Sequence, residues 1–280
     1  MAVLAPPDRP RAEPGHPGRD DDPGAPSAGG PQEAVQGDAA APGSARTGNT
    51  VPSPAVTTMF DEIAPVYDRV NTLLTFGADG RWRRAAVRAA ELGPGDAAID
   101  VACGTGKLAA ELAERVGPFG RVLGIDLSEP MIARGSEAFR DLVQLEFRCA
   151  NALALPVADG QYDAATIAFG LRNLTDFEAG FRELRRVVRP GGRVVCLELT
   201  TPRPRWWGRA FLALFGRVAP LAGSLAGRAA AYRYLRSSLD GFPDPDSLSR
   251  TMQNAGLVDV SVRRLGLGSI ALHVGVVPAG

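Results

Sequence analysis

The sequence predicts an α/β fold in which helices cover both faces of a doubly wound, mostly parallel sheet. Two observations lead to this prediction. From residue 97 onward, apolar runs of strand length alternate with amphipathic runs of helix length, a pattern that pairs strands in parallel through right-handed crossovers. The last two strand-like runs, 261–266 and 269–277, are separated only by a glycine-rich turn. They should therefore form a hairpin that places one antiparallel strand at the edge of the sheet.

The first 54 residues are predicted to form a disordered tail. They are rich in Pro, Gly and Ala, and no Phe, Trp or Tyr occurs before Phe60. Such a segment buries too little apolar surface to offset the entropy of ordering its chain. A transit peptide is the alternative, but the acidic run 20–22 does not suit one. Residues 55–280 are then expected to form one domain.

The elements of that domain follow in order from the apolar pattern. Residues 59–92 predict two helices with a break near 76–80, and "DAAIDVAC" (96–103) predicts a buried strand. A helix over 107–116 and a strand over 121–126 come next. The following helix begins at Ser128, a suitable N-cap, with Pro130 in its first turn.

The second half of the domain continues the alternation. Strands are predicted in 143–150, 162–170 and 192–199, with an amphipathic helix over 177–188 between the last two. Residues 200–240 form a long insert, which is expected to be a helical lid over the substrate.

Composition and charge exclude several classes of protein. The chain has 31 Lys and Arg against 31 Asp and Glu, so its net charge favours no nucleic-acid partner. Three scattered cysteines and two histidines predict neither a disulfide framework nor a metal site. We find no secretory signal and no apolar run long enough to span a membrane, so a cytoplasmic location is expected.

The stretch "DVACGTGKL" (100–108) predicts a ligand-binding loop between a strand and a helix. Gly104 and Gly106 let the backbone approach a ligand closely, and the amides there point to the start of a helix. Asp126, at the end of the next strand, is placed to accept hydrogen bonds from a ribose diol. These features fit a nicotinamide dinucleotide and S-adenosylmethionine equally well.

Three further features favour S-adenosylmethionine. Asp100 is a buried acid four residues before the loop, where it would orient the loop and attract a sulfonium cation. Asn151 and Ala152 follow the third strand, where a polar side chain and a backbone amide can contact an adenine edge. The run "LRRVVRPGGRVV" is a helix, turn and strand that would complete the cofactor half. An oxidoreductase would also need a hydride-transfer acid, such as a Tyr-x-x-x-Lys pair, which is not evident.

These residues resemble the class I S-adenosylmethionine-dependent methyltransferases, which have a Rossmann-like sheet. The match is closer to the UbiE/COQ5 family of C-methyltransferases, which act on ubiquinone and menaquinone precursors. It extends from about Met59 to the C-terminus and rests on "MFDEIAPVYDRVN" (59–71), "DVACGTGKL", "GIDLSEPMI", "ALALP", "TIAFGLRNLTD", "VVRPGGRVVCLEL", "AYRYLRSSLDGFPD" and "IALHVG".

The resemblance implies S-adenosylmethionine as cofactor and assigns roles to single residues. Thr105 falls in the binding loop, Asp126 at the ribose, and Asn151 and Ala152 at the adenine. Ala168 falls near the methionyl end, where the family often has serine, so only its backbone can contribute.

The acceptor side of the site is expected around "FGLRN". Arg172 and Asn173 follow a parallel strand at its carboxyl end, where open α/β sheets bind ligands. Arg172 would hold a phenolate or polarise a water, and Asn173 would fix the ring; a salt bridge and a helix cap are the structural alternatives. Further pocket candidates are Tyr67, Tyr232, Arg233, Tyr234 and His273, although His273 lies on an apolar strand and fits the core equally well.

The resemblance implies methylation of a prenylated, demethylmenaquinol-like hydroquinone. The sequence departs from the family at 79–81 and at 266, 267 and 269, and both segments are expected to face the acceptor. A polyketide or other small metabolite is therefore an alternative substrate. An NAD-dependent oxidoreductase and a catalytically silent binding module are weaker alternatives. The insert has seven arginines and no acid between 199 and 239, so it is either a simple lid or a peripheral membrane contact. A homo-oligomer is compatible with the sequence, which does not determine the oligomeric state.

Overall fold

The computed structural model describes residues 47–49, 53–65, 68, 72, 75, 77–202, 238, 239 and 241–279. Almost all of the expected insert lies outside these residues. The candidates Tyr67, Tyr232, Arg233 and Tyr234 lie outside them as well.

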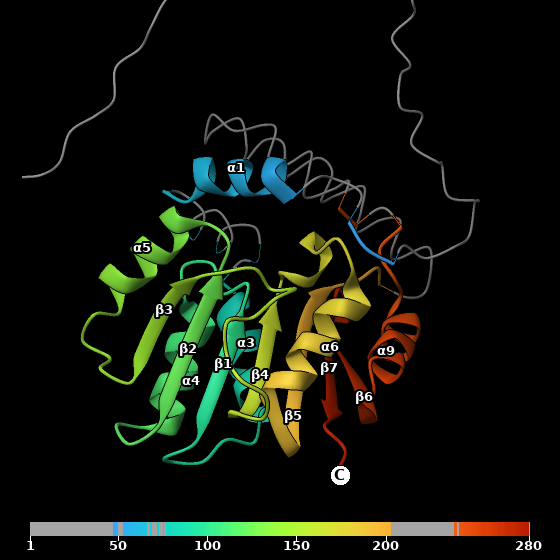
Figure 1. Cartoon of the computed structure of the whole chain (residues 1–280). Helices are drawn as coiled ribbons and strands as arrows, with labels where there is room; N and C mark the ends of the chain where they lie inside the picture. Colours follow the sequence, from blue (N-terminus) through green and yellow to red (C-terminus); the bar gives the residue numbers. More distant parts are fainter. Residues whose placement is uncertain are drawn as a thin grey trace, which may run out of the picture. The chain divides into compact units, whose positions relative to one another are not determined.

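A seven-stranded sheet forms the centre of the fold, with the strand order β3-β2-β1-β4-β5-β7-β6 (Figure 1). Strands β1 to β5 are paired in parallel, while β7 is antiparallel to both of its neighbours, β5 and β6. The predicted doubly wound sheet is therefore confirmed. The bounds are β1 Ala97–Val101, β2 Arg121–Asp126, β3 Leu145–Cys149, β4 Tyr162–Ala168, β5 Val188–Leu199, β6 Val258–Leu265 and β7 Ile270–Val276.

The expected hairpin, formed by β6 and β7, is present at the edge of the sheet. Strand β6 is the edge strand, and the antiparallel strand β7 lies between β6 and β5. Strand β7 reads IALHVGV and is largely buried, as a strand covered on both faces should be. Strand β6 is mostly exposed and carries Arg263 and Arg264. Because charged side chains discourage edge-to-edge pairing, β6 is the better edge strand and β7 fills the place beside β5.

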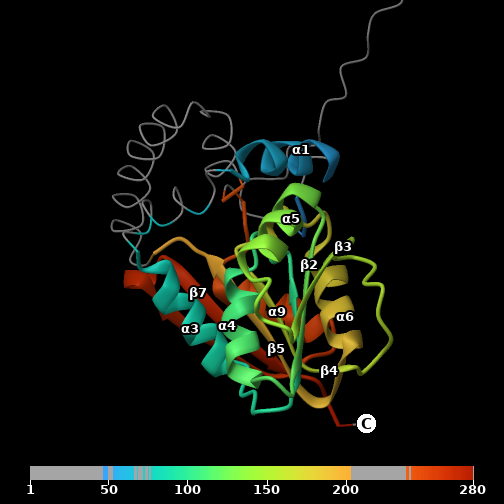
Figure 2. The same cartoon turned by 90° about the vertical axis from the view of Figure 1, so that its left-hand side faces the viewer.

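Helices cover both faces of the sheet, and α1 lies across its upper end (Figures 1 and 2). Helices α3, α4 and α5 pack on one face and α6 and α9 on the other. Helix α9 was not expected from the sequence; Asp244 caps its N-terminus and Pro245 occupies its first turn. The bounds are α1 Ser53–Ile63, α3 Asp79–Ala89, α4 Lys107–Val116, α5 Glu129–Ala138, α6 Phe177–Val187 and α9 Pro245–Asn254.

Each face of the sheet has its own apolar core. In α6, Phe177, Phe181 and Leu184 recur at helical spacing and are buried against β4 and β5. In α4, Leu108 and Leu112 pack on the opposite face. Full burial of such a side chain contributes about 1.5–3 kcal/mol, so these two stripes hold the helices at fixed positions beside the strand ends.

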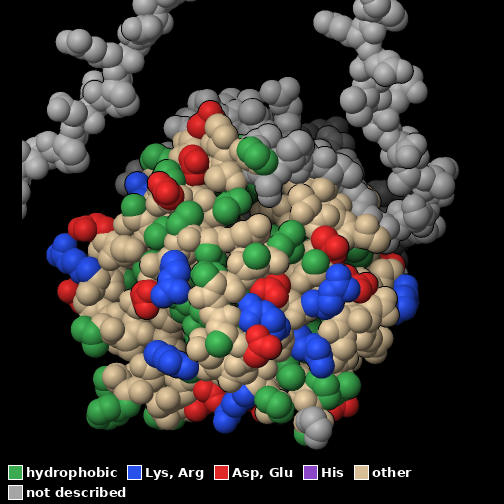
Figure 3. Space-filling view, in the orientation of Figure 1, with side chains coloured by type: hydrophobic (Ala, Val, Ile, Leu, Met, Phe, Trp, Pro, Cys, Tyr) green, Lys and Arg blue, Asp and Glu red, His purple; other side chains and the backbone are tan. Residues whose placement is uncertain are grey.

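Charges of both signs are interspersed on the face seen in Figure 3, where helix α6 faces the viewer. Charged residues of α6 form ion pairs: Arg182 with Glu178 at 2.5 Å, and Arg186 with Glu183 at 2.8 Å and with Asp159 at 2.7 Å. This view shows no broad basic surface of the kind that binds nucleic acid.

A short N-terminal segment docks on the domain upstream of the boundary expected at 54 and 55. The amide of Asn49 donates to the carbonyl of Leu174 at 2.7 Å, and the amide of Phe177 donates to the carbonyl of Thr47 at 2.9 Å. Asn49 is also buried. The ordered chain therefore includes residues 47–49, and α1 begins at Ser53.

We expect two N-terminal truncations to differ in stability. Removing residues 1–46 should leave the melting temperature and turnover unchanged. Removing residues 1–50 also deletes the two backbone hydrogen bonds, each worth about 0.5–1.5 kcal/mol. In a domain of this size each kcal/mol lowers the melting temperature by roughly 2–4 °C. Equal melting temperatures for the two truncated proteins would show that the 47–49 segment does not stabilise the fold.

Candidate active site

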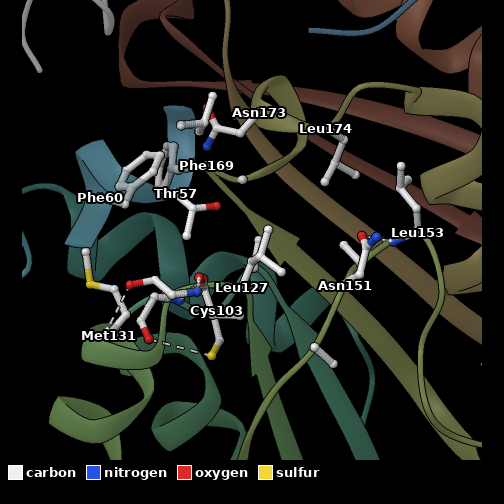
Figure 4. A pocket seen from close by; sticks show the side chains of 18 of the residues that line it. Thr57, Phe60, Cys103, Leu127, Met131, Asn151, Leu153, Phe169, Asn173 and Leu174 are labelled. Carbon is white, nitrogen blue, oxygen red and sulfur yellow. Dashed lines mark hydrogen bonds between the residues drawn. The ribbon is translucent and has the colours of Figure 1, made fainter. Parts of the chain in front are cut away.

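A cleft of about 900 Å³, counting the part open to solvent, lies at the carboxyl ends of the parallel strands. Its walls are the segments that follow β1, β2, β3 and β4, and helix α1 contributes Thr57 and Phe60 (Figure 4). Of the residues expected from the sequence, Gly104, Asp126, Asn151, Ala152, Ala168 and Asn173 line the cleft. The expected residues Asp100, Thr105, Gly106, Arg172 and His273 do not line it.

The glycine loop makes a tight turn into α4. Gly106 has a φ of 79°, and a Cβ there would lie 2.3 Å from the ring of Phe147, so no other residue fits. Thr105 is buried, and its hydroxyl donates to Asp68 at 2.9 Å instead of facing the cleft. Lys107 Nζ lies 3.3 Å from the same carboxylate. Asp68 thus holds the loop through Thr105 and Lys107, and of residues 104–106 Gly104 is the one that lines the cleft.

Asp126 connects the two loops that follow β1 and β2. Its Oδ2 accepts a hydrogen bond from the amide of Gly104 at 2.8 Å, and its Oδ1 accepts one from the amide of Ser128 at 3.0 Å. A carboxylate has further lone pairs, so it can accept from a ribose diol as well. Burial is the main cause that raises the pKa of this carboxyl.

Two residues beside the cleft have strained backbones. Ala102 and Phe169, which follow β1 and β4 directly, have positive φ values of 55° and 57°. Only a few per cent of non-glycine residues adopt this conformation, and it is concentrated at functional sites. The two turns also touch, because a Cβ on Gly170 would lie 2.4 Å from Cβ of Ala102. The structure thus holds the β1 and β4 walls of the cleft in fixed register.

Asp100 lies in β1 behind the glycine loop and is 1% exposed. Its Oδ1 accepts a hydrogen bond from the hydroxyl of Thr166 at 2.6 Å. Burial raises the pKa of the Asp100 carboxyl to about 7, and the negative charge of Asp126 adds to the shift. Asp100 is therefore bonded to β4 and does not line the cleft, and its expected role in orienting the loop stays a prediction.

Asp100→Asn should stabilise the protein more at pH 8 than at pH 5. The carboxyl titrates at 3.8 in the unfolded chain and at about 7 in the folded one. As the pH rises between these values, only the unfolded state loses its proton, so the free energy of unfolding falls. The asparagine variant lacks this loss, which amounts to about 1.4 kcal/mol per pKa unit. Denaturant unfolding of the variant and the wild type at pH 5 and pH 8 measures this difference in stability. A stability gain of Asp100→Asn that does not grow with pH contradicts the assignment. The same pH-dependent gain in Asp141→Asn, at an exposed position, contradicts it as well.

The expected adenine side of the cleft is formed by a turn after β3. The side-chain oxygen of Asn151 accepts from the amide of Leu153 at 2.9 Å, which fixes the turn. Ala152 lies beside it in the wall, and Ala168 at the end of β4 contributes a backbone and a methyl group. All three line the cleft, and their contacts with the adenine and the methionyl end stay predictions.

Arg172 is a buried structural arginine, in contrast to the expected direct contact with the acceptor. Its side chain is 5% exposed, and Nη1 donates to Glu198 Oε1 at 2.7 Å and to the carbonyl of Phe169 at 2.5 Å. Glu198 also accepts from the amides of Arg172 and Leu199. The ion pair therefore anchors the turn after β4 to β5. Arg172 positions the loop, and its neighbour Asn173 is the residue that faces the cleft.

His273 lies in the core, the alternative that its apolar strand left open, and it is not among the described residues that line the cleft. It is fully buried in β7, and its Nε2 lies 2.9 Å from the carbonyl oxygen of Pro245. Burial lowers the pKa of the imidazole. The residue therefore helps to hold the start of α9 against the sheet and is not available to a ligand in the cleft.

Helix α1 is a wall of the cleft that the sequence analysis did not assign. Val56, Thr57 and Phe60 face the cleft, and the hydroxyl of Ser128 donates to Asp61 at 2.5 Å. The bond joins α1 to the loop after Asp126. The sequence signal for α1 as a cleft wall was the family-like run that begins at Met59. This run indicates that the segment is important in the family, but it does not indicate where the segment lies.

Comparison with known proteins assigns the family. The ubiE/COQ5 methyltransferase family matches residues 48–277. The chain belongs to this family. Its membership decides between the two ligands that the glycine loop left open: the protein is a methyltransferase, and S-adenosylmethionine is its cofactor.

Relatives in the ubiE/COQ5 family are similar over most of the domain. The demethylmenaquinone methyltransferase of Thermus thermophilus is 47% identical over 220 residues, which cover 78% of this chain and 99% of the relative. The ubiquinone/menaquinone biosynthesis C-methyltransferase UbiE of Geobacter sulfurreducens is 39% identical over 224 residues, 78% of this chain and 86% of the relative. The crystal structure of the [4+2]-cyclase SpnF shares the fold, with a TM-score of 0.62 at 17% identity over 85% of this chain and 99% of its own.

The residues of the cleft fit S-adenosylmethionine. An anionic acceptor stands where a ribose would lie, and a fixed glycine turn leaves room for the close approach of a ligand. The carboxylate of Asp126 in the cleft wall also suits a ligand that carries a sulfonium cation. Asp126, Gly104, Asn151 and Ala152 are the residues that would hold the cofactor.

Proposed function

We propose that the protein methylates a ring carbon of a demethylmenaquinol-like, prenylated hydroquinone. Two relatives named for demethylmenaquinone or quinone biosynthesis are 47% and 39% identical to it. The observation that carries the proposal is the cleft itself. It has the cofactor-side residue Asp126 and the "FGLRN" residue Asn173 in one cavity, beneath apolar side chains of α1.

The bound cofactor supplies an electrophilic methyl group with a good leaving group. The chain therefore has to bring the nucleophilic carbon into line, which proximity and orientation can accelerate strongly. Asn173 is placed to hydrogen-bond a ring hydroxyl and fix the ring. Phe60, Leu127 and Phe169 give the ring apolar contacts and limit access of water. Arg172 and Glu198 keep Asn173 in place.

The experiment is a methyl-transfer assay with the full chain, S-adenosylmethionine and a chemically reduced demethylmenaquinol. We expect a product heavier by one CH₂ unit, and none when the ring is left in the oxidised quinone form, because the quinone carbon is a poor nucleophile. Binding of S-adenosylhomocysteine, measured by its thermal shift, is the control for an intact site. Intact binding without ring methylation would reject this acceptor in favour of another small metabolite.

We also propose a peripheral contact with the cytoplasmic face of a membrane, where a prenylated acceptor resides. No helix among the described residues is long and apolar enough to cross a bilayer. The support comes from the sequence of the insert, with seven arginines and no acid between 199 and 239. Each arginine near an anionic surface contributes about 1 kcal/mol.

Salt-sensitive binding to anionic vesicles, with little binding to neutral ones, is the expected result for this contact. Neutralising Arg205, Arg209 and Arg217 together should weaken it and leave the affinity for S-adenosylhomocysteine unchanged. Co-sedimentation at low salt without preference for anionic vesicles would show that the insert is only a lid.

A further inference from the structure

A second cavity lies at the root of the insert, where β5 ends and α9 begins. It has a volume of about 600 Å³, counting the part open to solvent. Its described walls are residues 199–202 on one side and Leu239 with residues 242–245 on the other. The segments that enter and leave the insert thus face each other across this cavity.

Six of the nine described residues that line this cavity are apolar, and none of the nine is a cation. The apolar residues are Leu199, Pro202, Leu239, Phe242 and the prolines 243 and 245. The one charged residue, Asp244, is used by the protein, because its Oδ1 accepts from the amides of residues 246 and 247 at 3.0 and 2.9 Å. An uncharged hydrocarbon ligand therefore suits the cavity better than a polar one.

The walls are held in place by contacts within the protein. The ring of Phe242 packs edge-on against Phe177, with centroids 5.3 Å apart, and its amide donates to the carbonyl of Leu239 at 3.2 Å. The amide of Thr200 donates to the carbonyl of Ser269 at 2.8 Å. The cavity is therefore preformed, which lowers the cost of binding a flexible chain.

The cavity is close to the methyl-transfer cleft. Ala168, in the cleft wall, is in register with Leu197 of the neighbouring strand β5. Leu199 is two residues further along, so strand spacing and rise place it about 8 Å from the end of β4. Phe177, beneath Phe242, follows shortly after Leu174 and Thr175 of the cleft wall. Neighbouring segments of the chain thus line the two spaces.

We propose that this cavity receives the part of the prenyl tail nearest to the acceptor ring. The inference rests on the proposed function, since it needs a ring held in the cleft with an apolar substituent. A tail in this cavity leaves the cleft along the carboxyl edge of the sheet, so ring and tail bind to separate surfaces. The cavity then makes the enzyme selective for prenylated rings over the same ring without a tail.

The test compares two acceptors, a prenylated demethylmenaquinol and the same reduced ring without its tail. Leu239→Trp fills the cavity from a half-buried position. We expect the ratio of kcat/KM between the prenylated and the tailless ring to fall at least tenfold. Val143→Trp is the control, because it adds the same side chain at an 87% exposed position that does not line the cavity; it should leave the ratio unchanged. An unchanged ratio in Leu239→Trp overturns the inference.

A binding measurement separates failure of the inference from failure of the proposed function. Calorimetry with a soluble prenyl alcohol needs no turnover; it should detect binding to the wild-type protein and at least tenfold weaker binding to Leu239→Trp. Binding without turnover of either quinol would reject the proposed acceptor and keep the prenyl site. Turnover of the quinols without binding of the prenyl alcohol would support the proposed acceptor and reject the prenyl site. If Leu239→Trp melts early, Thr201→Trp, at an exposed position of the opposite wall, replaces it.

Discussion

Arg172→Ala is expected to lower stability, cofactor affinity and turnover together. The change leaves the carboxylate of Glu198 buried without its cation, and breaking a buried pair in this way costs about 3–5 kcal/mol. It also removes the bond to the carbonyl of Phe169, so the turn that carries Asn173 and adjoins Ala168 loses its anchor. A direct role on the acceptor ring predicts something else: a large loss of turnover, with stability and cofactor affinity nearly unchanged.

A double variant separates these two roles. Arg172→Met with Glu198→Gln removes both charges, and neutral replacement of a buried pair is often well tolerated. If Arg172 only positions the loop, the double variant should recover most of the stability and much of the turnover lost in Arg172→Ala. If Arg172 transfers or stabilises a proton, the loss of about 10²–10⁴-fold should remain after the fold is restored.

The exposed pair of Arg182 and Glu178 on α6 provides a matched control. The same substitutions there, Arg182→Met with Glu178→Gln, remove an ion pair whose arginine is 55% exposed. Such pairs contribute about 0–1 kcal/mol, so neither turnover nor the melting temperature should change much. A comparable loss at both pairs would mean that burial of Arg172 is not the cause.

Most of the fold was predictable because its signals are local. Apolar runs, glycine turns and the cap at Ser128 mark the strands and helices in order. Helix α9 was not predicted, although Asp244 and Pro245 mark its start. The inner position of β7 also follows from its composition, but only once β6 is recognised as the more charged strand.

The cleft was predictable where topology alone decides. Parallel strands end at one edge, so Asp126, Asn151 and Ala168 had to lie near each other. Local spacing in the sequence does not determine where a side chain points or which distant residues it contacts. Arg172 and Asn173 are adjacent in sequence, yet one faces Glu198 beneath the turn and the other faces the cleft.

His273 and α1 show the same limit in two other ways. Strand alternation cannot separate a pocket residue from a core residue when both faces of the strand are buried, as they are around His273. The wall that Thr57 and Phe60 form depends on a contact between α1 and the start of α5. This contact is the hydrogen bond between Ser128 and Asp61, which are 67 positions apart in the sequence. No local pattern specifies such a contact.

Asp126→Asn should weaken S-adenosylhomocysteine binding by about 1–3 kcal/mol, that is roughly 5- to 150-fold, because a diol loses a charged acceptor. The asparagine keeps the shape of the side chain but has only one acceptor oxygen. The amides of Gly104 and Ser128 both donate to the carboxylate, so one of them loses its partner. Leaving a buried donor unsatisfied costs about 1–3 kcal/mol, and we therefore expect lower stability as well.

Asp61→Asn is the control that isolates the ribose contact in this experiment. Asp61 lies close enough to raise the pKa of Asp126 and accepts the hydroxyl of Ser128, but it is not part of the described cleft wall. Its neutralisation removes one negative charge near the cofactor while the acceptor at 126 stays. Calorimetry should then show a small change for Asp61→Asn and a large one for Asp126→Asn. Equal losses would mean that Asp126 acts through its charge on the sulfonium side alone, and unchanged affinity in Asp126→Asn would remove it from the cofactor site.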